Sequence, residues 1–439
     1  MKGVKYYFKL LLAVIVHYKG LILISIVVGA LFFVILNIVN SRFFNKKITK
    51  IGITGHYHID DLPNEILEKI GAGLTKVDSG GNITPGLATN WDTSDKGKTW
   101  IFKLDNNTNW HDETTLSSTD INYDFSDIEI EKTDESTLIF KLKNPLSSFP
   151  YIVTRPIFKK GLLGTGDWEV KNLNLSGSFV NQLTLANNSE KLIYKFYPTT
   201  ERTKLALKLG EVDTLINQLD PAPFNTWATT DISSYSNDNQ VVTLFYNSID
   251  PVLSEKSLRQ SLSYAINKDA LEGKRAISPI SPLSWAYNPQ VKDYTYDTKR
   301  AKELIDELPD QQQNNLEIKL VTTPVLLPVA EKIADDWKEI GVDTIVQVSS
   351  IIPSEFQAYL TILDIPKDPD QYSIWHSTQS NSNISKYASP RIDKLLEEGR
   401  SILDIEERKK TYIDFQRFLL EDAPAAFLFH PTYYTIKRK

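Results

Sequence analysis

The sequence predicts an α/β protein in which a mixed or parallel sheet follows an apolar N-terminal segment. Strand-like and helix-like patterns alternate after residue 45, and residues 316–348 read as one strand–helix–strand unit of the kind that builds parallel sheets. The chain has 439 residues, of which 41% are hydrophobic, so two or more lobes with separate cores are expected.

The N-terminal segment is apolar from Leu21 to Val39 and carries no charge between Lys19 and Arg42. A helix that crosses a bilayer needs about 20 apolar residues, which this run supplies. The alternative is a cleaved signal peptide, but such peptides have about 7–15 apolar residues and a small-residue cleavage site. Residues 40–44 make a poor cleavage site. We therefore expect a cytoplasmic segment at 1–20 and an uncleaved transmembrane anchor at 21–40, although the lysines and arginines on both sides leave its orientation open.

The first half of the remaining chain has a strand-rich pattern. Trp91 and Trp100 lie in two strand-like runs joined by a tight turn at 95–97, and both are expected to be core residues. Further strands are expected at 101–104, 138–142 and 240–247, and a hairpin at 183–197 with its turn at 187–190. A short helix at 203–209 ends at Gly210, a typical C-cap.

The second half contains helices with clear start and stop signals. Ser254 or Ser257 is expected to cap a helix that runs to residue 266, and Asp297 or Thr298 begins another that ends at residue 309. The helix of the strand–helix–strand unit covers 329–340 and is followed by a strand at 342–348. The last two expected helices begin at Ser389-Pro390 and, through a capping box, at Asp404 with Glu407.

Composition and motifs argue against several functions. The formal net charge of -6 disfavours nucleic-acid binding, and 0 cysteines exclude disulfides, cysteine-based metal sites and a lipid-modified cysteine. No phosphate loop, hydrolase elbow or zinc-protease motif is present, so neither an enzyme nor a cofactor is expected. His56 and His58 form the one close histidine pair, without a third metal ligand near them in the sequence.

Several collinear segments from residue 70 onward resemble a known family of binding proteins. In this order they are similar to the extracytoplasmic solute-binding proteins of oligopeptide, dipeptide and nickel ABC transporters, known as bacterial solute-binding protein family 5. The segments are 85–91, 95–104, 109–112 with 119–121, 164–168, 209–213, 245–247, 258–267, 296–304, 340–342 and 393–424.

The resemblance implies a two-lobed clamp of the periplasmic-binding-protein type II, cluster C-like, fold. Lobe I would cover 45–238 and lobe II 239–439, and the lobes would close on a ligand by hinge bending. The expected partners are a peptide or small polar ligand, the permease subunits of an ABC transporter, and the membrane through the N-terminal helix. The soluble body would then face outward, with no nucleic acid and no cofactor bound.

The resemblance also indicates where ligand contacts lie. In peptide-binding relatives an aspartate just before a matching Asp-Pro segment pairs with the ligand's α-ammonium, and Asp364 is similar to it by position, with Asp370 as the competitor. The opposing interpretation is a solvated acidic loop. Trp375 is a candidate for stacking on the ligand. The complete set of expected ligand contacts is Asp364, Asp370, Tyr372, Trp375, Asn381, Asn383, Tyr246 and Asn247.

Two departures from the family pattern keep a second function open. The segment from Asp120 to Ile130 lacks a helical insertion, so one subdomain is expected to be reduced. The chain also stops at Lys439, before the expected return to the first lobe, either because that return was trimmed or because the sequence is a fragment. The alternative function is an envelope protein–protein interaction or chaperone module with a degenerate cleft.

Overall fold

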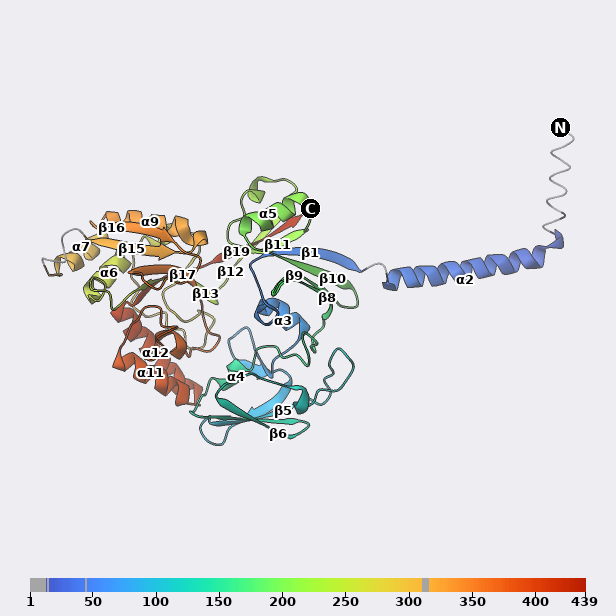
Figure 1. Cartoon of the computed structure of the whole chain (residues 1–439), viewed down its shortest axis with the longest axis horizontal. Helices are drawn as coiled ribbons and strands as arrows, with labels where there is room; N and C mark the ends of the chain where they lie inside the picture. The colour runs from blue at the N-terminus through green and yellow to red at the C-terminus, as the bar shows by residue number, and fades with distance from the viewer. Residues whose placement is uncertain (1–12, 14–15, 44–45, 310–315) are drawn as a thin grey trace.

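The computed structural model describes residue 13 and residues 16–43, 46–309 and 316–439. Figure 1 shows two lobes side by side, with helix α2 (Lys19–Phe43) projecting away from one of them. Most of the expected cytoplasmic segment, 1–20, lies outside the described residues. Within the described part of the chain, no helix has both the length and the apolar character of a membrane span. The expected anchor at 21–40 is therefore not confirmed.

The first lobe is built on a seven-stranded sheet with α3 (Asn64–Ile70) and α5 (Thr200–Leu209) packed against it. Its hairpin turn at 187–190 and the left-handed Gly210 after α5, with a φ of 76°, are both as the sequence predicts. In sheet order, the strands are β12 (Thr230–Ser236), β19 (Thr432–Arg438), β11 (Thr214–Gln218), β1 (Lys47–Thr54), β10 (Glu190–Tyr197), β9 (Phe179–Ala186) and β8 (Glu169–Ser176).

A smaller four-stranded sheet forms a subdomain of the first lobe. The expected turn follows from Asp95, whose side chain accepts hydrogen bonds from the backbone N–H groups of Lys98 and Thr99, at 3.0 and 2.7 Å. Trp100 is buried and Trp91 packs half-buried against the same core, as predicted. The strands are β4 (Ala88–Asp92), β5 (Thr99–Leu104), β7 (Thr137–Leu142) and β6 (Ile128–Asp134), and α4 (Phe149–Ile152) packs beside them.

The second lobe is a six-stranded sheet with helices on both faces (Figure 1). The predicted strand–helix–strand unit is confirmed, because β15 and β16 pair in parallel on either side of α9 (Leu327–Lys338) in the chain. In sheet order, the strands are β14 (Lys274–Arg275), β18 (Ala425–His430), β13 (Gln240–Tyr246), β17 (Ala358–Asp364), β15 (Glu317–Thr322) and β16 (Asp343–Val348).

Central strand β13 shows why both faces of this sheet are covered. Val242 and Leu244 point into a core shared with α6 (Lys256–Ala265), α7 (Thr298–Asp306) and α9. Val241 and Phe245 point into a second core, shared with α11 (Pro390–Ser401) and α12 (Ile405–Asp422). Because side chains alternate along a strand, an apolar run such as this one is buried on both sides.

The last strand corrects the expectation that the chain stops before returning to the first lobe. One residue, Pro431, separates β18 in the second sheet from β19, which pairs antiparallel with β11 and β12 in the first. A single strand of 7 residues provides the return. The expected boundary at 238/239 falls between β12 and β13, but residues 432–438 lie in the first sheet.

We predict that Ile436→Ala destabilises the first lobe selectively. Ile436 on β19 has no exposed surface and packs in the core with Leu215 and Phe224. Removing such a side chain costs about 2–5 kcal/mol. Hydrogen–deuterium exchange would show faster exchange in β11 and β12 than in β13 and β17. Ile405→Ala, at a 45% exposed position, is the matched control. Equal loss of protection in both sheets would contradict the assignment of β19.

Candidate functional site

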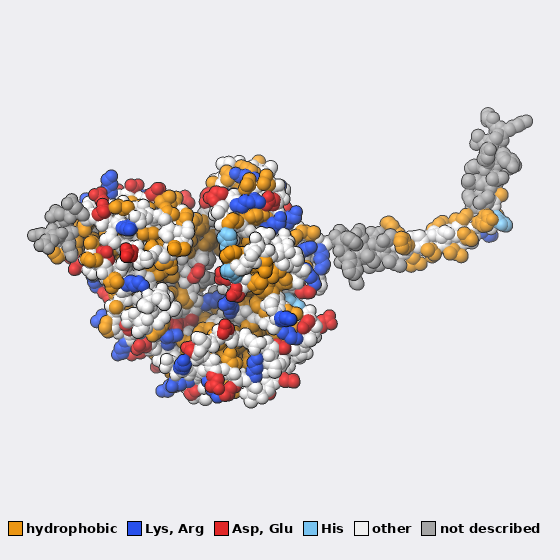
Figure 2. All heavy atoms as spheres, viewed as in Figure 1, with side chains coloured by type: hydrophobic (Ala, Val, Ile, Leu, Met, Phe, Trp, Pro, Cys, Tyr) orange, Lys and Arg blue, Asp and Glu red, His pale blue; other side chains and the backbone are white. Residues whose placement is uncertain are grey.

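A cleft between the two lobes contains three cavities that all contact Lys367. The first, of about 550 Å³, and the second, of about 400 Å³, lie against α3 and the segment 154–156 of the first lobe. The third, of about 540 Å³, lies between α4 and residues 366–373 of the second lobe. Figure 2 shows charged side chains of both signs around the hollow between the lobes. Lys367 is the residue that lines all three cavities, which together are called the groove below.

The loop that carries Lys367 begins where β17 ends at Asp364. Its prolines, Pro366 and Pro369, fix the backbone on both sides of Lys367. The loop ends in the short helix α10 (Tyr372–Trp375), whose first N–H donates to Asp370 Oδ1 at 3.0 Å. Local turn chemistry therefore holds the loop in one conformation beside the cleft.

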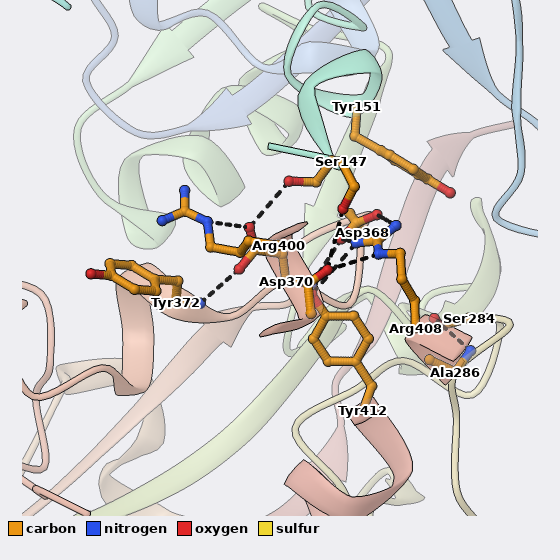
Figure 3. Close-up of polar contacts among 12 residues, drawn as sticks. Ser147, Tyr151, Ser284, Ala286, Asp368, Asp370, Tyr372, Arg400, Arg408 and Tyr412 are labelled. Atoms are coloured by element: carbon orange, nitrogen blue, oxygen red, sulfur yellow. Dashed lines mark hydrogen bonds and ion pairs between the residues drawn. The ribbon is translucent and has the colours of Figure 1, made fainter. Parts of the chain in front are cut away.

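Asp368 anchors this loop inside the second lobe through a buried ion pair. Arg408 on α12 donates two hydrogen bonds to the carboxylate, at 2.7 and 3.1 Å, and both side chains are 5% exposed (Figure 3). Arg408 Nε also donates to the backbone oxygen of Gly399, at 3.0 Å. Burial opposes the charged guanidinium, but the Asp368 carboxylate outweighs this and raises the pKa of Arg408. The charge of Asp368 is thus already balanced.

Asp370 connects the same loop to α11 and to the first lobe. Its carboxylate forms an ion pair with Arg400 Nε at 3.0 Å (Figure 3). It also accepts a hydrogen bond from Ser148 Oγ at 3.1 Å. The Arg400 guanidinium lies over the ring of Tyr372, 4.3 Å from its centroid. Next to Ser148, the Ser147 N–H donates to the backbone oxygen of Arg400 at 2.7 Å. These contacts join the lobes at one end of the cleft.

The structure brings two of the eight expected ligand residues into the cleft. Asp370 and Tyr372 both line the third cavity, opposite Tyr151 of the first lobe. Asp364 lies outside the three cavities, at the exposed end of β17, where it accepts a hydrogen bond from the Gln240 side chain at 2.6 Å. The role expected for Asp364 stays a prediction.

The other five expected residues lie away from these cavities. Trp375 and Tyr246 have no exposed surface. The indole N–H of Trp375 donates to Gln371 Oε1 at 2.8 Å, and the hydroxyl oxygen of Tyr246 lies 3.1 Å from Ser263 Oγ. The side chains of Asn247 and Asn383 donate to backbone oxygens, at 2.9 and 2.8 Å. Asn381 is exposed on the loop after α10. In this structure the side chains of Trp375, Tyr246, Asn247 and Asn383 make contacts within the second lobe. Ligand contact by any of the five residues stays a prediction.

Sequence reasoning missed the charged residues that come together from distant segments. Lys367 lay in the expected loop but received no role, because nothing in the sequence says which loop side chain faces the cleft. Glu68 on α3 lies in the cleft as well. Its one sequence signal is that Ile66, Leu67 and Ile70 are apolar, so that Glu68 falls on the exposed face of the helix.

The close histidine pair lies in the first lobe and packs on an aromatic ring. His56 and His58 both contact Phe179, and His58 Nδ1 lies 3.1 Å from the backbone oxygen of Ser178. Across the described segments, no group of three histidine or acidic side chains is arranged to hold a metal ion. Nothing there favours a metal site.

Comparison with known proteins identifies the family. The model of the family described as "Bacterial extracellular solute-binding proteins, family 5 Middle" matches residues 82–383, well over half of the chain. The protein belongs to family 5. The resemblance seen in the sequence motifs is therefore confirmed. Members of family 5 are solute-binding proteins, not enzymes.

Two curated relatives cover most of this family 5 chain. It is 25% identical to the dipeptide-binding protein of Escherichia coli (strain K12) over 90% of its own length and 88% of that protein's. It is 24% identical to the oligopeptide-binding protein AppA of Bacillus subtilis (strain 168), with 85% and 83% covered.

Solved structures share the mixed α/β fold of this family 5 protein. NikZ from Campylobacter jejuni in complex with Ni(L-His) superposes with a TM-score of 0.75 at 21% identity, covering 90% of this chain and 94% of that one. AppA from Bacillus subtilis in complex with a nonapeptide gives a TM-score of 0.71 at 20% identity, covering 90% and 95%. The predicted mixed α/β fold of periplasmic binding proteins is confirmed, and its type II, cluster C-like assignment stays a prediction.

We predict that the Asp368–Arg408 pair is essential to the stability of the second lobe. Asp368→Leu leaves a buried guanidinium without its counter-charge and should cost about 3–5 kcal/mol, measured by urea unfolding of the full chain. Asp368→Leu combined with Arg408→Leu should be less destabilised than Asp368→Leu alone, because no charge is then left buried. Asp364→Leu, at an exposed position, is the control. A double variant as unstable as the sum of its single variants would contradict the pairing.

Proposed function

We propose that the protein is the membrane-anchored substrate-binding protein of an ABC importer. It captures peptides or similar small polar solutes between its two lobes and delivers them to the permease on the outer side of the membrane. The observation that carries this proposal is the groove between the lobes of a family 5 chain, made of three cavities that share Lys367. The names of its relatives, a dipeptide- and an oligopeptide-binding protein, support the class of solute.

The groove has the properties that capture requires. Each cavity, at about 400–550 Å³, is within the range of about 300–1,000 Å³ that small-molecule sites occupy. Both lobes line the third cavity, and Lys367 of the second lobe lines the other two, so hinge closure would exclude water from a bound solute. Asp370 and Tyr372 are the expected ligand residues that already face it. The alternative, a degenerate cleft kept for protein contacts, is not favoured by an open groove of this size.

We predict that short peptides bind the full-length protein in detergent and stabilise it. A ligand that binds only the folded state at about 100 times its Kd adds about 2.7 kcal/mol, which raises the melting temperature. Titration of a panel of dipeptides and tripeptides, followed by isothermal calorimetry and by intrinsic tryptophan fluorescence, measures this. If no peptide changes either signal or the melting temperature, solute capture of this class is ruled out.

Substitution of Asp370 and of Asp364 distinguishes which of the two aspartates contacts the peptide. Asp370→Asn should weaken peptide binding by about tenfold or more, because a charged hydrogen-bond acceptor in the groove is lost. Asp364→Asn is the matched comparison, since its side chain lies outside the cavities. A larger loss at Asp364 than at Asp370 would favour the assignment made from sequence position.

Two parts of the proposal, the membrane anchor and the contact with the permease, rest on the sequence. The run from Leu21 to Val39 supports the anchor, because a helix of about 20 residues matches the thickness of a bilayer core. The described apolar side chains of α2 from Leu21 to Val34 are exposed, with no other described part of the chain covering them. Attachment to the membrane would keep the protein near its permease without a lipid-modified cysteine.

We predict that deleting residues 21–39 moves the protein from the membrane fraction to the soluble fraction. Peptide affinity should not change, because the groove lies in the two lobes. Carbonate extraction of membranes followed by immunoblotting measures the distribution, and calorimetry measures the affinity. A deletion variant that still resists carbonate extraction would contradict the anchor and leave solute capture unaffected.

A further inference from the structure

One ion pair crosses the cleft where the first and second cavities lie. Lys367 Nζ of the second lobe lies 3.5 Å from Glu68 Oε1 of the first. The two side chains are 43% and 53% exposed, so water screens their attraction and the pair contributes little to holding the lobes together. Such a contact is easily exchanged for another partner.

The other charges that the second lobe presents to the cleft are already balanced within that lobe. Arg408 neutralises Asp368, and Arg400 pairs with Asp370. Among the described residues that line the three cavities from the second lobe, Lys367 is the one charge whose only ionic partner lies across the cleft. Lys367 is therefore the cationic side chain of the second lobe that is available to an anionic group of a ligand in these cavities.

The first lobe places the carboxylate of Glu68 next to Lys367. Glu68 lines the first and second cavities, and its ionic partner in the described chain is Lys367 alone. Its neighbour Lys69 lines only the first cavity, and Arg155 in the second donates to the backbone oxygen of Asp60. Glu68 and Lys367 are thus the two opposite charges shared by both cavities.

We propose that Lys367 and Glu68 determine specificity by receiving the two ends of a zwitterionic solute, its carboxylate at Lys367 and its ammonium at Glu68. This inference rests on the proposed function, solute capture, and adds to it the charge and the direction of the solute. Each new contact is a charge-assisted hydrogen bond in a cleft that closure dries, and is stronger there than the screened pair it replaces.

The length of a short peptide suits replacement of the Lys367–Glu68 ion pair. Two extended residues span about 7 Å, more than the 3.5 Å that now separates the paired atoms, so the lobes or the side chains must move apart to admit it. Once seated, the solute joins the lobes through its own charges. A solute that lacks either charge leaves one of the two side chains without a partner and binds more weakly.

The test uses the full-length protein and the dipeptide that binds most tightly, with its C-terminal amide and its N-acetyl derivative. The wild type should bind the free dipeptide at least about tenfold more tightly than either derivative. Lys367→Met should abolish the preference for the free acid over the amide. Glu68→Gln should abolish the preference for the free amine over the N-acetyl form.

Glu65→Gln, on the same helix as Glu68 but outside the three cavities, is the matched control and should keep both preferences. Melting temperatures should stay unchanged in all three variants, because the substituted side chains are exposed. If Lys367→Met and Glu68→Gln weaken all three ligands equally, or change none, the assignment of the two ends is overturned while solute capture stands. If the wild type binds no dipeptide, the proposed function fails and this inference fails with it.

Discussion

The arrangement of the molecule depends on two chain crossings that lie beside each other. In the described residues the chain passes between the lobes at 237–239 and at Pro431, and the N–H of Asn237 donates to the backbone oxygen of Pro431 at 2.9 Å. Both covalent links therefore lie at one place. The contacts at the cleft are separate from them and consist of hydrogen bonds and ion pairs between surfaces, which can break and re-form. A clamp requires this division between a permanent link and exchangeable contacts.

The loop after β17 shows how the second lobe makes a rigid wall from charged residues. Asp368 and Asp370 lie two positions apart, yet each has its own arginine, Arg408 from α12 and Arg400 from α11. These arginines fix the loop from behind and balance its negative charge. Lys367 is left to face the groove. The wall is therefore defined as much by buried pairs behind it as by the side chains on its surface.

Local features were readable from the sequence, and contacts between distant segments were not. The cap of α12 follows from Asp404, whose side chain accepts from the N–H of Glu407 at 2.9 Å, and the turn at Asp95 follows in the same way. The burial of Trp375 depends on packing against the second-lobe sheet, which no local pattern reports. Lys367 meets Glu68 across 299 positions of chain, so their pairing appears only once both lobes are folded.

Both ends of the folded body belong to the same lobe. Strand β1 begins at Lys47, soon after α2 ends at Phe43, and β19, at the other end, lies in the same sheet. If α2 is the membrane anchor proposed above, the membrane is linked directly to the first lobe and reaches the second lobe only through the two crossings. In that arrangement, hinge opening and closing would change mainly the position of the second lobe relative to the membrane.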